Sequence, residues 1–444
     1  EQNYRSTHTI LKAANAVIDK NSGRLGKTLW TDQGEGELIE VFSGFNETDE
    51  ARFIASTIRA ALQTDASPAD FALLYRANAQ SRVLEEALIR EQLPYRIYGG
   101  QRFFERAEIK TALAYLRLII NRHDDSSFQR IINTPARGIG DKTLDELSNI
   151  AVQHGLPLWL ALERSLLENR QGRAYKALLS FQQLILQLAE QIETLSLSNK
   201  LEQLIEKSGL LAMYQQEGEA GQSRIENLRE LVSACEQFEQ VDDEVDATTQ
   251  FLDHIALEMG ERGNQSEGPA ISLMTLHAAK GLEFPVVFLS GFEENVFPSS
   301  NAKDSPSQLE EERRLCYVGI TRARKKLYIT RADSRRLYGN ENYNPPSRFL
   351  KEIPSSLLLN RQENFSISRP VFYQSPAPTP APRAQSLPSG EGLFALGQQV
   401  SHPKFGEGVI LSYEGQGANI RVHVNFRKAG SKWLVLHYAR LEAC

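Results

Sequence analysis

Strand-like apolar segments alternate with amphipathic helical ones at the start of this chain, and the alternation then stops. Residues 37–42 and 71–75 have the pattern of strands, and residues 47–62 and 79–91 have the pattern of the helices that follow them. This order is typical of a parallel sheet covered by helices. From about residue 105 to residue 259, apolar residues instead recur at helical spacing almost throughout. The chain must therefore combine a parallel sheet with a long helical segment.

The α/β pattern returns after this helical segment. Strand-like apolar runs lie at residues 271–274, 286–289 and 327–330. The simplest interpretation is a single α/β domain whose sheet is interrupted by an all-helical insertion, which we place at residues 101–268.

The last part of the chain has a different composition. Residues 360–390 are rich in Pro, Ser, Ala and Gln, which is typical of a flexible, partly extended linker. Beyond it, residues 397–441 hold short alternating strands separated by Gly-rich turns. We predict a small β-barrel on a tether, whose aromatic residues Phe405, Tyr413 and Trp433 either bind a partner or only fill the core.

Composition excludes several classes of protein. Hydrophobic residues make up 41% and charged residues 24% of the chain, as in an ordinary globular protein. No apolar run approaches the roughly 18 residues that a membrane span needs, so we expect a cytoplasmic protein without membrane contact. The three cysteines are too scattered for a disulfide framework or a zinc site, and we predict no metal ligands. The net charge of -6 neither indicates nor excludes nucleic acid as a partner.

Residues 23–28 end like a phosphate-binding P-loop but lack its other features. Asn21 stands where the motif needs its first glycine, and the segment before it is helical, not a strand. An acidic strand end of the Walker B kind is also missing from the sequence. We therefore interpret residues 23–28 as a surface turn and predict that this chain does not bind ATP tightly by itself.

Residues 271–327 combine an apolar strand, a polar loop with His, Lys and Glu, and an Arg-rich segment. Arg322 and Arg5 are cations that could complete a phosphate site held by another domain, where such an arginine speeds hydrolysis roughly a thousandfold or more. Tyr4 could stack on a purine, and Glu283 could accept a ribose hydroxyl. Alternatively, the arginines belong to an ordinary solvated basic face and Tyr4 lies at the edge of a core.

Five short motifs follow one another along the chain. They read QNYRST, YRANAQSR, YRIYGG, TLHAAKGLEFP and YVGITRAR, at residues 2–7, 75–82, 95–100, 275–285 and 317–324. In this order they resemble the motifs of the UvrD/PcrA/Rep family of superfamily 1 DNA helicases. The resemblance covers essentially the whole chain.

The resemblance implies a bacterial motor with two RecA-like domains that moves 3'-5' along single-stranded DNA while hydrolysing ATP. It divides this chain into the second RecA-like domain (1–100 and 269–357), its helical insertion (101–268), a disordered linker (358–392) and a Tudor/SH3-like domain (393–444). The first RecA-like domain would be missing. The chain begins with Glu1, and its first methionine is Met213, which fits a start inside a longer protein.

The resemblance also assigns the nucleotide contacts. Tyr4 would stack on adenine, Arg5 and Arg322 would contact the γ-phosphate, and Glu283 would contact the ribose. The missing upstream domain would bind most of the ATP and its Mg2+. We therefore expect near-zero ATPase from this chain alone.

The predicted DNA contacts lie in two loops. Arg76 and Asn78 follow a strand end, where a loop can meet phosphates, and the resemblance puts Thr275 and His277 in a loop that couples nucleotide state to DNA grip. Phosphate contacts bind DNA without sequence preference and weaken as salt rises.

Two further DNA contacts come from turns. Tyr338 follows two arginines in a tight turn and resembles the family's strand-separating pin, although it could also fold back onto its own domain. Gly138 and Gly140 form a Gly-x-Gly turn at a helix start, where free backbone N–H groups and Lys142 can bind a phosphate. The resemblance implies contact with duplex DNA at a single-strand/double-strand junction, whereas a simple helix connector is the alternative.

Two classes of function remain open. In the first, this is the C-terminal part of a helicase of nucleotide excision and mismatch repair, whose barrel docks on RNA polymerase and which works with repair proteins at the nucleoid. In the second, it is an adaptor that binds DNA and a protein partner without hydrolysis. An in-frame upstream segment with a P-loop would favour the first.

Overall fold

The computed structural model describes most of the chain. The described residues are 3–4, 6–22, 30–168, 171–239, 247–260, 268–303, 305–337, 340–361, 398–403, 406–414, 421–426, 430–435 and 441–443. Two compact units are present, Glu1–Gln362 and Glu363–Cys444. Within the described part of the chain, no helix is both long and apolar enough to cross a membrane.

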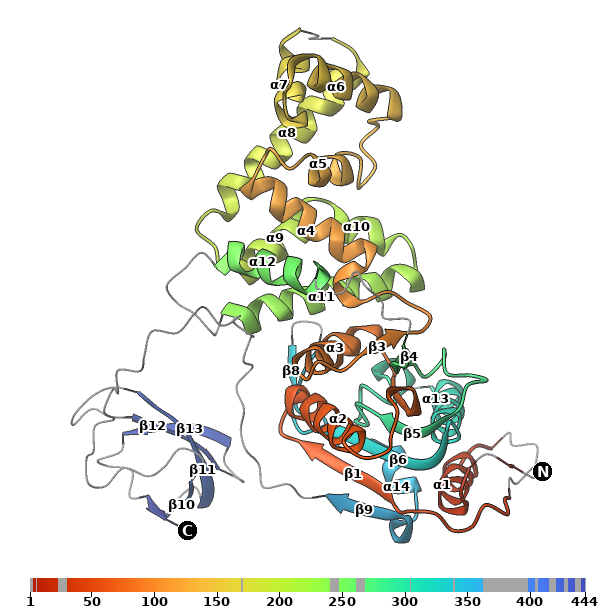
Figure 1. Cartoon of the computed structure of the whole chain (residues 1–444). Helices are drawn as coiled ribbons and strands as arrows, with labels where there is room; N and C mark the ends of the chain where they lie inside the picture. Colours follow the sequence, from red (N-terminus) through yellow and green to blue (C-terminus); the bar gives the residue numbers. More distant parts are fainter. Residues whose placement is uncertain are drawn as a thin grey trace. The chain divides into compact units, whose positions relative to one another are not determined.

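In the described part of the first unit, seven strands form a parallel sheet (Figure 1). Its order is β3-β4-β2-β5-β6-β1-β9. The strands are β1 (Ile39–Gly44), β2 (Phe71–Tyr75), β3 (Tyr95–Ile97), β4 (Ile271–Thr275), β5 (Phe284–Leu289), β6 (Ala323–Ala332) and β9 (Leu358–Arg361). The predicted α/β fold with a parallel sheet is confirmed.

Helices cover both faces of this sheet. Alternate residues of a strand point to opposite faces, and in β2 Ala72 and Leu74 belong to one apolar core whereas Leu73 and Tyr75 belong to another. The first core is completed by α1, α13 and α14, and the second by α2 and α3. These helices are α1 (His8–Ile18), α2 (Glu47–Leu62), α3 (Ser81–Arg90), α13 (Pro306–Ile320) and α14 (Arg348–Glu352).

The start of α1 differs from an ordinary capped helix. Thr7 is the N-cap residue but makes no side-chain capping bond, and the Ser6 hydroxyl instead donates to the Ala323 carbonyl at 2.6 Å. The first N–H groups of the helix donate to carbonyls of a neighbouring loop, His8 to Gly34 at 2.9 Å and Thr9 to Glu35 at 2.9 Å. A distant loop thus supplies the acceptors that a serine or threonine side chain usually provides.

Between β3 and β4 the described residues form helices and no strand. They are α4 (Ala107–Ile120), α5 (Asp125–Ile131), α6 (Asp141–His154), α7 (Leu158–Glu168), α8 (Arg173–Ile192), α9 (Leu197–Lys207), α10 (Leu210–Gln215), α11 (Glu219–Glu239) and α12 (Ala247–Gly260). They share a core of their own, in which the Phe128 ring packs edge-on against Trp159 and Phe181.

The helical segment joins the sheet domain through buried charges between α3 and α11. Arg82 is 1% exposed, and its Nε lies 2.8 Å from Glu230 Oε1 on α11. Arg106 donates to Asn227 Oδ1 at 2.8 Å and to the Ser81 hydroxyl at 2.7 Å. Buried polar groups are tolerated when they are paired in this way, so this seam depends on complementary partners more than on apolar contact.

Two elements lie near the end of the first unit, and the first of them departs from the sequence expectation. Residues 358–361, expected to begin the linker, form β9 and pair with β1 in the sheet. Residues around the predicted pin form an antiparallel hairpin of β7 (Arg335–Leu337) and β8 (Asn340–Asn342).

The second unit is an antiparallel sheet of five strands in its described part, in the order β13-β12-β11-β10-β14. The strands are β10 (Gln399–His402), β11 (Gly406–Glu414), β12 (Arg421–Phe426), β13 (Gly430–Val435) and β14 (Glu442–Ala443). Its core consists of Val400, Ile410, Val422, Val424 and Phe426. Pairing between β13 and β14, which would close a barrel, is not found among the described residues, so the barrel remains a prediction.

Candidate functional site

The N-terminal segment lies against the start of β6. Besides the Ser6 bond to Ala323, the Thr7 N–H donates to the Arg324 carbonyl at 3.2 Å. These contacts bring Tyr4 to the end of the sheet where Arg322 precedes β6. The Tyr4 carbonyl accepts a hydrogen bond from Gln33 Nε2 at 3.2 Å, and its side chain is 74% exposed. An exposed ring on an anchored backbone is suited to stacking on a flat ligand.

Arg322 is fixed at the junction between α13 and β6. Its Nη1 donates to the Leu282 carbonyl at 2.7 Å, and its Nε donates to the Val318 carbonyl at 3.1 Å. The Phe284 N–H donates in return to the Arg322 carbonyl at 2.9 Å. The guanidinium is therefore held beside the loop that leads into β5.

That loop carries Glu283. The Glu283 carboxylate is exposed and lies 3.9 Å from Arg324 Nε. The structure thus brings Tyr4, Glu283 and Arg322 to one region, although they come from three distant parts of the sequence. Arg5, the fourth predicted nucleotide contact, lies outside the described residues.

The predicted DNA loops meet at a sheet edge. β2 and β4 are parallel neighbours in which Tyr75 pairs with Thr275, so the loops that begin with Arg76 and Leu276 leave the same edge. Carboxyl ends of parallel strands are the usual place for ligand sites in such folds. Arg76 forms a two-pronged ion pair with Glu312 of α13, with 2.9 Å from Nε and 2.7 Å from Nη2 to Oε1.

His277 and Thr275 lie at this edge too. Burial lowers the pKa of His277, and the positive charge of Arg76 lowers it further, so the imidazole is neutral at pH 7. Thr275 Oγ1 accepts a hydrogen bond from the Ala278 N–H at 3.3 Å, which helps to shape the loop.

Gln80 supports the Arg76 loop, a role that no sequence pattern indicated. Its Oε1 accepts from the N–H groups of Arg76 at 3.1 Å and Ala77 at 2.9 Å. Asn78, by contrast, faces the helical segment, with its Nδ2 3.4 Å from the Ser223 hydroxyl.

The Gly-x-Gly turn lies in the helical segment, apart from the other predicted contacts in sequence. Gly138 has a φ of +74°, and Gly140 is the N-cap of α6 with open space where a Cβ would stand. Lys142 is exposed in the first turn. Arg137, next to the turn, anchors it by donating hydrogen bonds to the Tyr115 hydroxyl at 2.6 Å and the Ser208 carbonyl at 3.0 Å.

Comparison with known proteins decides the family. Residues 1–334 match the UvrD-like helicase C-terminal domain, and residues 396–442 match the PcrA/UvrD tudor domain. The chain belongs to the UvrD-like helicase family. The resemblance that the five motifs indicated is confirmed.

Curated relatives of this UvrD-like chain extend beyond it. DNA helicase II of Escherichia coli is 51% identical, and the match covers 100% of this chain and 61% of the relative. DNA helicase II of Haemophilus influenzae is 49% identical with the same coverage. The ATP-dependent DNA helicase PcrA of Bacillus subtilis is 41% identical and matches 100% of this chain and 62% of its own length. The UvrD-like chain thus spans about three fifths of these relatives.

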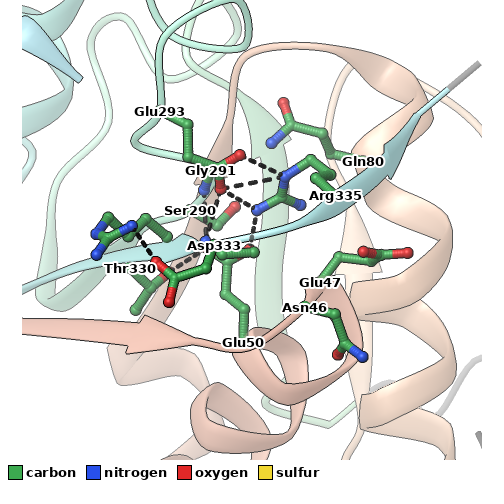
Figure 2. Close-up of polar contacts among 12 residues, drawn as sticks. Asn46, Glu47, Glu50, Gln80, Ser290, Gly291, Glu293, Thr330, Asp333 and Arg335 are labelled. Atoms are coloured by element: carbon green, nitrogen blue, oxygen red, sulfur yellow. Dashed lines mark hydrogen bonds and ion pairs between the residues drawn. The ribbon is translucent and has the colours of Figure 1, made fainter. Parts of the chain in front are cut away.

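The UvrD-like chain also contains a buried charge cluster that sequence reasoning missed. Figure 2 shows the Arg335 guanidinium between the carboxylates of Glu293 and Glu50. Arg335 is the first residue of β7 in the β7–β8 hairpin, and Tyr338, the predicted pin, lies outside the described residues. The only sequence signal was an arginine pair before that tyrosine, which reads equally well as a DNA-facing basic patch.

Proposed function

We propose that this chain is the C-terminal part of an ATP-dependent 3'-5' DNA helicase that serves nucleotide excision and mismatch repair. The observation that carries the proposal is the convergence of Tyr4, Glu283 and Arg322 at one end of the sheet. An aromatic face, a carboxylate and a guanidinium match the adenine, the ribose and the γ-phosphate of ATP in turn. These three contacts make half of a nucleotide site.

The other half belongs to an upstream domain in this proposal. That domain supplies the P-loop and the acidic residues for Mg2+, and ATP lies in the cleft between the two domains. Arg322, together with Arg5, then stabilises the charge that develops on the γ-phosphate. The carbonyls of Leu282 and Val318 hold the Arg322 guanidinium before the nucleotide arrives, which lowers the entropy cost of this contact.

The DNA contacts lie at the carboxyl edge of β2 and β4. Single-stranded DNA runs over the loops that carry Arg76, Asn78, Thr275 and His277, which bind its phosphates without reading its bases. Because α13 carries Glu312, the partner of Arg76, and ends at Ile320, two residues before Arg322, one helix connects the DNA edge with the nucleotide end. A shift of α13 with nucleotide state would change both contacts together.

The remaining parts contact the junction and partner proteins. Tyr338 stacks on the last base pair as the pin, and the turn at Gly138, Gly140 and Lys142 holds the duplex phosphates ahead of it. The C-terminal sheet docks on RNA polymerase and links the motor to transcription. We propose a division of the chain at residues 100, 268 and 392, and we extend the second RecA-like domain from residue 357 to residue 361 because β9 belongs to its sheet.

ATP hydrolysis provides the test. The purified chain should show near-zero ATPase with or without single-stranded DNA, and the same chain fused to its upstream domain should show DNA-stimulated turnover. Robust hydrolysis by the chain alone would overturn the division of the nucleotide site. DNA binding by the fusion without hydrolysis would favour the non-catalytic adaptor instead.

A further inference from the structure

The cluster around Arg335 consists of three charged side chains removed from solvent. The side chains of Arg335, Glu50 and Glu293 are 5%, 2% and 0% exposed. Burying charges is costly, and a buried ion pair often stabilises a fold no better than apolar residues of similar volume. Overall stability alone therefore does not account for this cluster, whereas a demand for one fixed arrangement does.

The hydrogen bonds of the cluster join several segments of the chain. Arg335 Nη2 donates to Glu50 and, at 2.6 Å, to Glu293 Oε1. Glu50 Oε1, on α2, accepts from the Thr330 hydroxyl of β6 at 2.6 Å and from the Gly291 N–H at 2.8 Å. α2, β6, the loop after β5 and the first residue of β7 are thus fixed to one another (Figure 2).

The same cluster fixes the base of the β7–β8 hairpin. Arg335 is opposite Asn342 in the hairpin. The next residue, Arg336, donates its backbone N–H to Glu47 Oε2 at 3.1 Å and its Nη1 to Glu236 Oε2 of α11 at 3.1 Å. The hairpin base therefore has anchors in the sheet domain and in the helical segment.

The cluster also reaches the Arg76 loop. Gly291, whose N–H is held by Glu50, has a φ of +70° and lies so close to Gln80 that a Cβ on it would be 2.2 Å from Gln80 Nε2. Gln80 Oε1 in turn holds the backbone of Arg76. A continuous line of contacts runs from Arg335 through Glu50, Gly291 and Gln80 to Arg76.

We propose that Arg335 is a positioning residue. Through Glu50 and Glu293 it holds the β7–β8 hairpin in a fixed position relative to the Arg76 loop. The inference rests on the proposed function, in which single-stranded DNA crosses that loop and Tyr338, which follows β7 in the sequence, acts as the pin at the duplex. When the hairpin is held in this position, each advance of single-stranded DNA over the Arg76 loop drives the single-strand/double-strand junction onto the pin. When the hairpin is displaced, the helicase still advances along DNA but separates the two DNA strands poorly.

The test uses the full-length helicase with Arg335→Lys, which keeps the charge but loses the forked geometry. Duplex unwinding should fall about tenfold or more, because misplacing a positioned group by about 1 Å can cost about a hundredfold. The ATPase stimulated by single-stranded DNA should stay within about twofold of wild type, since the nucleotide contacts are elsewhere. Thr330→Val, which removes one bond to Glu50, should show the same split more weakly.

Arg348→Lys is the matched control. Arg348 makes the same forked ion pair with Glu294, at 3.0 Å from Nε and 2.7 Å from Nη2, yet it has no bond to the hairpin among the described contacts. Its ratio of unwinding to ATPase should remain that of wild type. Backbone hydrogen exchange should rise selectively in residues 335–342 of the Arg335 variant, whereas a general loss of stability would raise it in β4 and β5 as well.

Tyr338→Ala distinguishes the pin role of Tyr338 from the positioning role of Arg335. If Tyr338→Ala impairs unwinding while Arg335→Lys and Thr330→Val leave the ratio of unwinding to ATPase unchanged, the pin role is supported and the positioning role is overturned. If Tyr338→Ala leaves unwinding intact, the pin itself is wrong. If both Arg335→Lys and Thr330→Val lower ATPase and unwinding equally, or raise exchange throughout the sheet, Arg335 is only structural.

Discussion

Arg76 and Glu312 bind each other through two prongs of the guanidinium, with the carboxylate almost wholly buried and the arginine partly exposed. The side chain of Glu312 is 7% exposed and that of Arg76 is 26% exposed. A DNA phosphate that approaches Arg76 must therefore compete with a carboxylate already in place. If Arg76 contacts DNA as proposed, Glu312 sets the strength of that contact without touching DNA itself.

Glu312→Gln should strengthen DNA binding. The amide keeps the shape of the side chain but removes the competing charge, so we expect the full-length protein to bind single-stranded DNA about three to ten times more tightly at low salt. Fluorescence anisotropy over a salt series measures this change. Glu311→Gln is the matched control, since Glu311 is 70% exposed and pairs with Arg314 instead. Equal effects of the two variants would remove Arg76 from the DNA contact.

Arg322→Ala should abolish most hydrolysis. Loss of an arginine that stabilises γ-phosphate charge lowers turnover roughly a thousandfold, and single-turnover ATPase of the full-length protein measures it. Lys325→Ala removes an exposed cation three residues further along β6 and should leave turnover near wild type. Since Arg322 also bonds Leu282, thermal unfolding of both variants must be compared. Unchanged turnover in a folded Arg322→Ala would exclude the proposed phosphate contact.

Gly291→Ala should weaken both folding and the DNA loop. The new Cβ would lie 2.2 Å from Gln80 Nε2 and 3.1 Å from Val296 Cγ1, at a φ of +70°. Strain of this kind costs about 1 to 3 kcal/mol of the free energy of unfolding, which urea denaturation measures. Gly268→Ala, with nothing within 4 Å of its Cβ, should change that free energy by less than about 0.5 kcal/mol.

Some elements of the fold could be predicted from the sequence, whereas tertiary contacts such as that of Gly291 with Gln80 could not. The helix at residues 47–62 and the strand at residues 71–75 were predicted at their observed bounds, because apolar periodicity is a local signal. β9 was missed because only its pairing with β1 makes a strand of an exposed segment next to a linker. Side-chain chemistry suggested that Tyr4, Glu283 and Arg322 could contact one nucleotide, and the family motifs assigned each of them its role.

The buried cluster of Arg335, Glu50 and Glu293 could not be predicted from the sequence for a related reason. Glu50 reads as a surface residue of an amphipathic helix, and Arg335 reads as part of a basic turn, because a charged side chain gives no sign of a partner 285 positions away in the sequence. Propensity and periodicity describe a residue's neighbours along the chain. They carry no information on charge pairs that form only when the sheet assembles.

Glu85 should make stability depend on pH. Burial raises the pKa of Glu85 to about 7, although Arg106 and the hydroxyls of Ser81 and Tyr95 partly offset this. In the unfolded chain the pKa of this carboxyl lies near its ordinary value of 4.5. The folded state therefore holds the extra proton between these values, and its stabilisation is complete below pH 4.5 and lost as pH rises through about 7.

Glu85→Gln tests this dependence. The wild-type free energy of unfolding should fall by at most about 3 kcal/mol across that window, and the amide should flatten the slope. Urea denaturation at a series of pH values measures it. Glu168→Gln, at an exposed position of α7, should retain the wild-type slope, and an unchanged slope in Glu85→Gln would place the proton elsewhere.

The helical segment occupies the place of an ordinary crossover. β3 and β4 are parallel neighbours, with Tyr95 opposite Ile271, and any such pair needs a connection of a dozen or more residues. Here α4 to α12 are that connection, grown into a body with its own core. This body can therefore be lengthened, shortened or reshaped without altering the order of the sheet, so in the proposed helicase the contact with duplex DNA could diverge while the sheet domain stays the same.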